Sequence, residues 1–293
     1  MIIESIKKEP VFGEWYTSHK VFKRLSEIEK FYEVVHDRSC GFIETPITKN
    51  FINTQCVLYP SLEGTIHSIT LLIENGHIND AFALMRKYCD ALIIDTYKSI
   101  LIKETYNQLS NDVSWESIAN NKVSNWINSN SPLMENRPVN ELKRIAQTFP
   151  EIFSIMNLNP KDSNSLYARI RSLCNDNMHY NNFLNFLWND PNYLNYDRTS
   201  AIYLLNKVYS CITFLASMHF SFLYVYHPEY FMSIDYVDYL DFGEMPPEGA
   251  ERWIAPYLQD FFTNVVYPQN KKLGDYLISL DSMDLIYGTG KDK

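Results

Sequence analysis

The feature that most constrains this chain is an uncharged stretch from Tyr209 to Tyr226. Its sequence, YSCITFLASMHFSFLYVY, contains no Asp, Glu, Lys or Arg. A segment of this length just reaches the lower limit for a membrane span, but three serines and His219 dilute its hydrophobicity. We therefore expect a helix that is buried in the core of a helical protein, with a membrane-spanning helix as the alternative.

The composition also favours helices. Hydrophobic residues make up 46% of the 293 residues and aromatic residues 15%, which is too apolar for a disordered chain. Only 9 residues are glycine, whereas β-sandwiches and barrels need glycines in their turns. We predict an all-α fold: a bundle of antiparallel helices with N- and C-terminal helical extensions.

Charge and cysteine content narrow the functional classes. The net charge of −9 and the pI near 5.3 are unlike those of a general nucleic-acid binder, which is usually basic. The five cysteines are widely spaced without a CxxC pair, which predicts neither a disulfide framework nor a structural zinc site. The N-terminal sequence MIIESIKKEP carries charges where a signal peptide is apolar. We expect a cytoplasmic protein without metal, cofactor or membrane partner.

Breakers and apolar periodicity divide the chain into three parts. Residues 1–60 form an N-terminal helical segment and a connector, residues 61–228 the core bundle, and residues 229–293 an acidic, aromatic segment whose short helices pack on the bundle. The core helices are expected over residues 61–75, 79–104, 138–149, 163–188 and 199–226. The helix over 79–104 is apolar on more than one side, which places it at the centre of the bundle.

Two groups of polar residues are candidates for chemistry. The segment RSLCNDNMHYNN carries Arg171, Asn175 and His179 at spacings of about one helical turn, so their side chains can form a ladder. On the central helix, Arg86 and Asp90 are also one turn apart among apolar neighbours, which predicts a partly buried ion pair. In a bundle the two groups can face each other, and bundle cores are a common place for functional sites.

The segments ALMRKYCDAL and RSLCNDNMHYN resemble helical domains of the HEPN superfamily, over roughly residues 60–226. Many members of that superfamily are metal-independent endoribonucleases, among them toxins and abortive-infection effectors against phage. Others are inactive partners or RNA-binding modules. The catalytic motif of the family is an Arg followed by four to six residues and a His, contributed by both chains of a dimer. The resemblance implies a homodimer in bacterial defence with RNA as its substrate.

The match to that motif is partial. His179 fits it, but seven residues separate Arg171 from His179 and Ser172 stands where the longest permitted spacing needs the arginine. On a helix, Arg171 and His179 point about 80° apart. If the chain cleaves RNA, His179 acts as general acid or base. Arg171 or Arg86 then stabilises charge on the phosphorus, and the ribose 2′-hydroxyl is the nucleophile.

A non-catalytic interpretation stands beside this one. Buried Asn and His side chains on helices are more often satisfied structural groups than catalysts, so the Arg-Asp-Asn-His cluster can simply hold helices together in an interaction module with an unknown protein partner. The exposure of His179 discriminates between the two. An enzyme needs His179 in a solvent-reachable basic cleft, whereas a structural cluster needs it closed off. Cys174 lies about 140° from His179 around the helix, so the two cannot form a catalytic pair within it.

Overall fold

The computed structural model describes residues 12–39, 54–109, 121–134, 139–180 and 182–287. These residues contain helices and no β-strand, apart from one isolated antiparallel bridge between Met232 and Ile254. The predicted all-α class is therefore confirmed.

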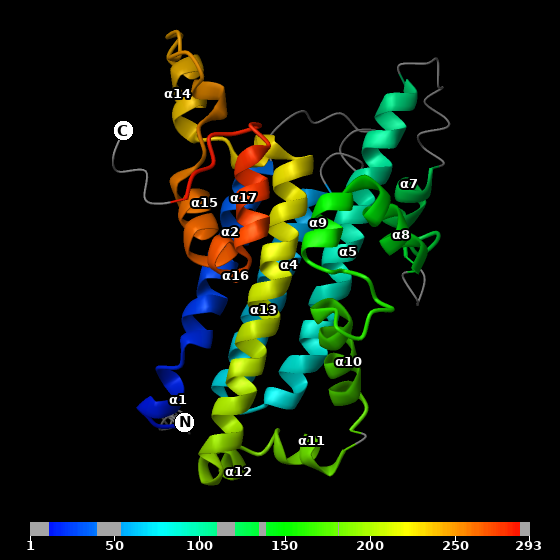
Figure 1. Ribbon diagram of the computed structural model, residues 1–293, viewed down its shortest axis with the longest axis vertical. Helices are drawn as coiled ribbons and strands as arrows, with labels where there is room; N and C mark the ends of the chain where they lie inside the picture. Colours follow the sequence, from blue (N-terminus) through cyan, green and yellow to red (C-terminus); the bar gives the residue numbers. More distant parts are fainter. Residues whose placement is uncertain (1–11, 40–53, 110–120, 135–138, 181, 288–293) are drawn as a thin grey trace, which may run out of the picture.

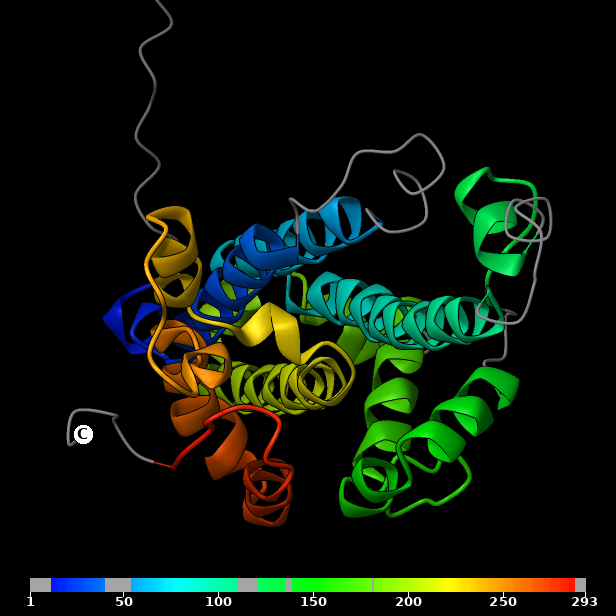
Figure 2. The same cartoon turned by 90° about the horizontal axis from the view of Figure 1, so that it is seen from above.

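Four long helices form the centre of the molecule and run side by side (Figures 1 and 2). They are α2 (Lys20–Ser39), α4 (Gln55–Glu74), α5 (Ile78–Leu109) and α13 (Arg198–Tyr226). Helix α4 runs antiparallel to α2 and α5, whereas α13 runs in the same direction as both (Figure 1). The chain reaches the start of α13 by descending through α10 (Leu166–Met178), which packs on α5.

Helix α5 is central, as its sequence predicts. It packs against α4, α10, α13 and α8 (Val139–Thr148). Contact on several sides explains why its apolar residues do not follow a single stripe, since a helix enclosed by neighbours needs no polar face. This enclosure fixes the position of the charged residues that α5 carries.

The uncharged stretch from Tyr209 to Tyr226 is the second half of α13. Helices α4 and α13 are both long and apolar enough to cross a membrane, but 83% of the most apolar window of α13 is buried inside the protein, against 33% for α4. The side chain of His219 is fully buried within this stretch. In this fold α13 is a core helix, as expected.

The predicted helix over residues 163–188 is wrong in its second half. Helix α10 ends at Met178, with His179 as its C-cap and Tyr180 at a φ of 48°. A separate short helix, α11 (Phe183–Leu187), follows after Asn182, whose side chain accepts a hydrogen bond from the Leu184 amide. Asparagine side chains compete for backbone hydrogen bonds and favour caps over helix interiors, so the asparagine-rich sequence ends one helix and starts the next.

The corner between α4 and α5 follows the sequence signal more closely. Gly76 has a φ of 78°, and its amide donates to the carbonyl of Ile73 while the His77 amide donates to that of Leu72. This is a Schellman-type helix end, which favours glycine. A Cβ at Gly76 would lie 2.6 Å from the ring of Phe12, so close packing adds a second constraint. The helix starts six residues before the expected Ser61, because Pro60 is accommodated inside its second turn.

The segments on either side of residues 61–228 belong to the same hydrophobic core. Tyr32 of α2, Phe231 and Phe261 are buried in the cluster that α5 and α13 also build. The aromatic segment after Tyr226 docks in part: Phe231 is buried, whereas Phe242 is 81% exposed. The other described helices are short: α1 (Glu14–Thr17), α7 (Lys122–Ile127), α9 (Pro150–Ile155), α12 (Pro191–Tyr196), η1 (Pro228–Phe231), α14 (Ile234–Asp241), η2 (Ala250–Arg252), α15 (Pro256–Phe261), η3 (Phe262–Val266), α16 (Tyr267–Gln269) and α17 (Lys271–Ser279).

Candidate functional site

Asp90 on α5 joins two arginines. Its Oδ2 accepts a hydrogen bond from Arg86 Nε at 3.0 Å, and its Oδ1 accepts one from Arg171 Nη1 of α10 at 2.7 Å. Arg171 Nη1 also donates to the hydroxyl of Tyr167 at 3.2 Å. The predicted Arg86–Asp90 pair is confirmed, and Arg171 joins it from the neighbouring helix. We call Arg86, Asp90 and Arg171 the Asp90 cluster.

The Asp90 cluster is only partly enclosed. The exposed fractions of the side chains are 13% for Arg86, 26% for Asp90 and 16% for Arg171. Charge-assisted hydrogen bonds at this depth are stronger than at the open surface, because less water screens them. Each carboxylate oxygen of Asp90 already serves one guanidinium. The cluster therefore ties α10 to α5 and offers no free carboxylate to act as a base.

The other two predicted residues lie outside this cluster, contrary to the expectation of one shared site. Asn175 and His179 are both exposed, and neither side chain makes a hydrogen bond or ion pair with another described residue. The cause is the helical rotation from Arg171, which faces α5, to His179 about 80° away. The helix also ends just before His179, so its side chain projects from the C-terminal end of α10.

The neighbouring asparagines are largely structural. Asn189 Nδ2 donates to Asp80 Oδ1 at 2.8 Å and to the hydroxyl of Tyr180 at 2.9 Å. Asn79 Nδ2 donates to the backbone carbonyl of Asn177 at 3.1 Å. These bonds connect the start of α5 to the turn after α10. Within RSLCNDNMHYNN itself, Asn177 Nδ2 donates to the Leu173 carbonyl at 2.7 Å and Asn182 Oδ1 accepts from the Leu184 amide at 3.1 Å, so these two asparagines serve the helix corner.

His179 stands beside a group of exposed apolar side chains, which we call the α11 patch. Its members are Met178, Tyr180, Phe183, Leu184 and Phe186, with exposed fractions of 44%, 39%, 74%, 41% and 56%. The rings of Tyr180 and Phe186 stack with centroids 4.5 Å apart, and those of Phe183 and Phe186 are 6.4 Å apart. Single exposed apolar residues are ordinary, but contiguous groups of this kind mark interaction surfaces.

The strongest charged cluster in the described residues was not predicted from the sequence. Asp95 Oδ1 accepts a hydrogen bond from Lys98 Nζ at 2.7 Å, and Asp95 Oδ2 lies 2.9 Å from His219 Nε2. His219 Nδ1 is 3.0 Å from the Tyr32 hydroxyl, which is 2.5 Å from the hydroxyl of Tyr88. We call these five residues the Asp95 network.

The Asp95 network is closed to solvent. All five side chains are fully buried. Burial alone raises the pKa of Asp95, but the positive charge of Lys98 and the hydrogen bond from His219 outweigh it and hold that pKa below its usual range. Burial also raises the pKa of Tyr32 well above its usual value. Strongly perturbed pKa values often mark active sites, but no substrate reaches groups without exposed surface, so we assign the network to the core.

The three free cysteines in the described part of the chain are poor nucleophiles. Cys89, Cys174 and Cys211 are free and buried, and burial raises the pKa of Cys89 to about 11 and that of Cys174 further still. The buried Cys174 and the exposed His179 do not pair, as the helical geometry predicts. Cys56 is disulfide-bonded, which the expectation against a disulfide framework did not foresee.

Comparisons with models of protein families, with curated proteins and with solved structures find no match for this chain. The resemblance to HEPN domains therefore depends on the short segments of α5 and α10, and it stays a hypothesis.

Proposed function

We propose that this chain is a non-catalytic helical interaction module that pairs with a second copy of itself through the α11 patch. The observation that supports this most directly is that the predicted site residues do not form one site. Arg86, Asp90 and Arg171 satisfy one another and connect α10 to α5. His179 is exposed and is therefore not part of a closed structural cluster, but it lies apart from both arginines and not in a basic cleft formed with them, beside exposed aromatic side chains. In this proposal the Asp90 cluster holds α10 in place, and α10 and α11 present the apolar side chains of the α11 patch.

The test of this proposal is the oligomeric state in solution. We expect the protein to be a dimer by light scattering after size-exclusion chromatography. Phe183→Asp should weaken the dimer by about 30-fold or more, because it places a charge in the centre of a desolvated apolar contact. Phe242→Asp is a matched control, since Phe242 is 81% exposed on the segment after α14 and lies outside the patch. A monomeric wild-type protein, or equal effects of the two variants, would contradict the proposal.

A second candidate is a HEPN-like, metal-independent endoribonuclease of cytoplasmic bacterial anti-phage defence. One observation favours it: His179 is exposed to solvent and has no described partner, so its imidazole is available for proton transfer. In this proposal His179 removes the proton from the 2′-hydroxyl of the ribose. The resulting oxygen attacks the adjacent phosphorus, the bond from phosphorus to the 5′-oxygen breaks, and that oxygen takes the proton back from the His179 imidazolium through water, which gives a 2′,3′-cyclic phosphate and a free 5′-hydroxyl.

The Asp90 cluster bears on this candidate. One carboxylate holds two guanidiniums, so the group keeps one net positive charge for a phosphate. The direct test is RNA cleavage by the wild-type protein in the presence of a chelator. If His179 is the acid or base, His179→Ala should reduce the rate by about 10²–10⁴-fold. His67→Ala is a suitable control, because the His67 side chain is 61% exposed on α4. A wild-type protein that leaves RNA intact and harms no host would exclude the nuclease and leave the interaction module.

A further inference from the structure

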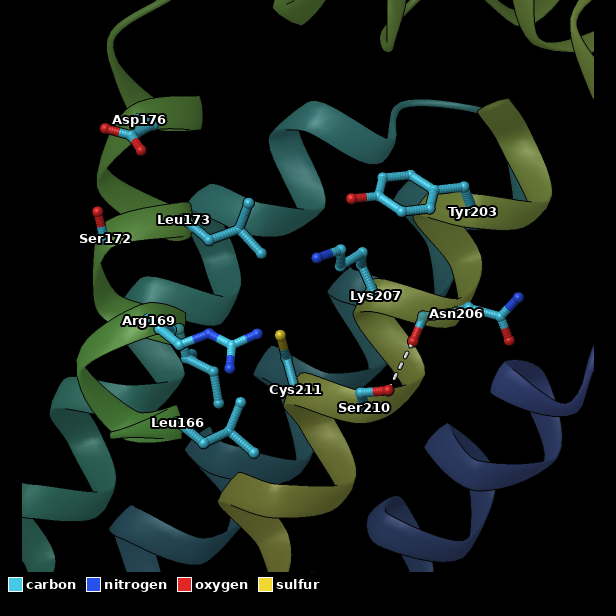
Figure 3. A pocket seen from close by; sticks show the side chains of 11 residues that line it. Leu166, Arg169, Ser172, Leu173, Asp176, Tyr203, Asn206, Lys207, Ser210 and Cys211 are labelled. Carbon is cyan, nitrogen blue, oxygen red and sulfur yellow. Dashed lines mark hydrogen bonds between the residues drawn. The ribbon is translucent and has the colours of Figure 1, made fainter. Parts of the chain in front are cut away.

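A groove of about 640 Å³ lies between α10 and α13 (Figure 3). Its walls come from residues on the facing sides of the two helices: Leu166, Arg169, Ile170, Ser172, Leu173, Asp176, Tyr203, Asn206, Lys207, Ser210 and Cys211. The groove is separate from the Asp90 cluster, which is on the side of α10 that faces α5. The volume is in the range of sites for small molecules, about 300–1,000 Å³.

The polar groups that point into the groove are hydrogen-bond donors. The guanidinium of Arg169 enters from α10, and the ammonium of Lys207 and the hydroxyl of Tyr203 enter from α13 (Figure 3). Burial raises the pKa of the Cys211 thiol at the base of the groove to about 12, while the positive charges of Lys207 and Arg169 act in the opposite direction. Both cations therefore lie close to the same buried point.

These two cations have no counter-ion among the described residues. The Arg169 guanidinium makes no ion pair or hydrogen bond with a described residue, and the Lys207 ammonium lies over the ring of Tyr203, with Nζ 5.1 Å from the centroid, without an ion pair to a described residue. Several other described arginines hold carboxylates, as Arg171 holds Asp90. In a chain with a net charge of −9, this groove brings together two cations that form no ion pair with a described residue.

The side chains of Asp176, Asn206 and Ser210 neither neutralise the two cations nor offer a free donor to an anion. Asp176 lines the groove, but its carboxylate points away from Arg169 and Lys207 (Figure 3). Asn206 Nδ2 donates to the carbonyl of Ile202 at 3.0 Å, and Ser210 Oγ donates to that of Asn206 at 2.9 Å. Leu166 and Leu173 add apolar wall beside the cations (Figure 3). The groove therefore suits a ligand with an anionic group and an apolar body.

We propose that this groove binds a small phosphorylated molecule of about the size of a mononucleotide, independently of the proposed function. Its phosphate lies between Arg169 and Lys207, and its apolar body lies against Leu166 and Leu173. A phosphate fits better than a carboxylate, because its second negative charge and third oxygen match two cations and the donor hydroxyl of Tyr203.

Calorimetric titration of the full chain with AMP, inorganic phosphate and adenosine tests this proposal. We expect AMP to bind with one-to-one stoichiometry, inorganic phosphate to bind more weakly and to compete with AMP, and adenosine to bind at least tenfold more weakly than AMP. Arg169→Gln and Lys207→Gln should each weaken AMP binding by about tenfold or more, because each removes a charge-assisted hydrogen bond to the phosphate.

Arg198→Gln is the matched control. It removes one positive charge from α13, the helix that carries Lys207, but the Arg198 guanidinium lies over the ring of Trp15. It should leave AMP binding unchanged. The proposal is overturned if neither AMP nor inorganic phosphate binds, if adenosine binds as tightly as AMP, or if Arg198→Gln weakens binding as much as Arg169→Gln. Binding of an oligoribonucleotide that depends on Arg169 and Lys207, in a protein that does not bind AMP, would assign the groove to RNA backbone instead. Thermal melting of each variant shows that a loss of binding does not come from unfolding.

Discussion

Two of the carboxylates on helix α5, those of Asp90 and Asp95, are five positions apart, and each is paired with two nitrogen-bearing side chains. Asp90 faces α10 and keeps 26% of its side chain exposed, whereas Asp95 faces α13 and is fully buried. The contacts are alike in number and length, but their surroundings differ. At Asp90 water can replace a lost partner, while at Asp95 it cannot. The difference in burial therefore decides how much each pair matters for folding.

The largest effect is expected for Asp95→Ala. The substitution leaves Lys98 and His219 in the core without their acceptor, and breaking a buried pair from one side costs about 3–5 kcal/mol. Chemical denaturation measures the loss in the free energy of unfolding. Asp241→Ala at the exposed end of α14 is the control and should change it by less than about 0.5 kcal/mol. Equal values for the two variants would show that the Asp95 network contributes nothing to stability.

A smaller loss is expected for Asp90→Ala, about 1.5–3 kcal/mol, because it removes charge-assisted hydrogen bonds in a place that water reaches. The same denaturation experiment gives the value. Arg171→Met is the companion variant, and the effect of combining it with Asp90→Ala should fall short of the sum, since both remove the same contact. A loss as large as that of Asp95→Ala would show that the difference in burial does not decide how much each cluster contributes to stability.

The Asp95 network should also make the stability of the protein sensitive to acid. Because the pKa of Asp95 is depressed in the folded state, its ionised form stabilises the fold above the unfolded pKa of about 4, and this contribution is lost as the pH falls through the folded value. The expected slope is at most about 1.4 kcal/mol per pH unit. We predict that acid destabilises the wild-type protein more steeply than the double variant Asp95→Asn, Lys98→Met. Unfolding curves below pH 5 with equal slopes would contradict this assignment.

The sequence predicted the Asp90 cluster only in part and the Asp95 network not at all. Spacing along one helix is visible in the sequence, so Arg86 and Asp90 could be paired in advance. The partners of Asp95 are Lys98 on the same helix and His219 on another, 124 positions away. A signal was present, since His219 lies alone in an uncharged core stretch and Asp95 and Lys98 are three positions apart on a helix that is apolar all round.

The position of α10 shows the other limit. Its apolar and polar periodicity predicts a helix, but periodicity does not reveal where asparagine caps replace helical hydrogen bonds. The ladder of Arg171, Asn175 and His179 assumed a common face, and the structure turns only Arg171 toward α5. Rotation about the axis of a helix depends on its packing partners, so the sequence of α10 alone does not determine which side chains are buried.

The smallest effect on stability is expected for Asn175 and His179, the two exposed residues of the predicted ladder. Asn175 and His179 are exposed and contact no described polar group, so Asn175→Ala and His179→Ala should each change the free energy of unfolding by less than about 0.5 kcal/mol. Chemical denaturation provides the measurement, and Arg171→Met provides the contrast on the same helix. If either alanine variant loses about 1–3 kcal/mol, the side chain has buried partners and the separation between the Asp90 cluster and the α11 patch does not hold. A result within the expected range shows that both variants are folded. Any loss of the dimer or of RNA cleavage in them then reports on function alone.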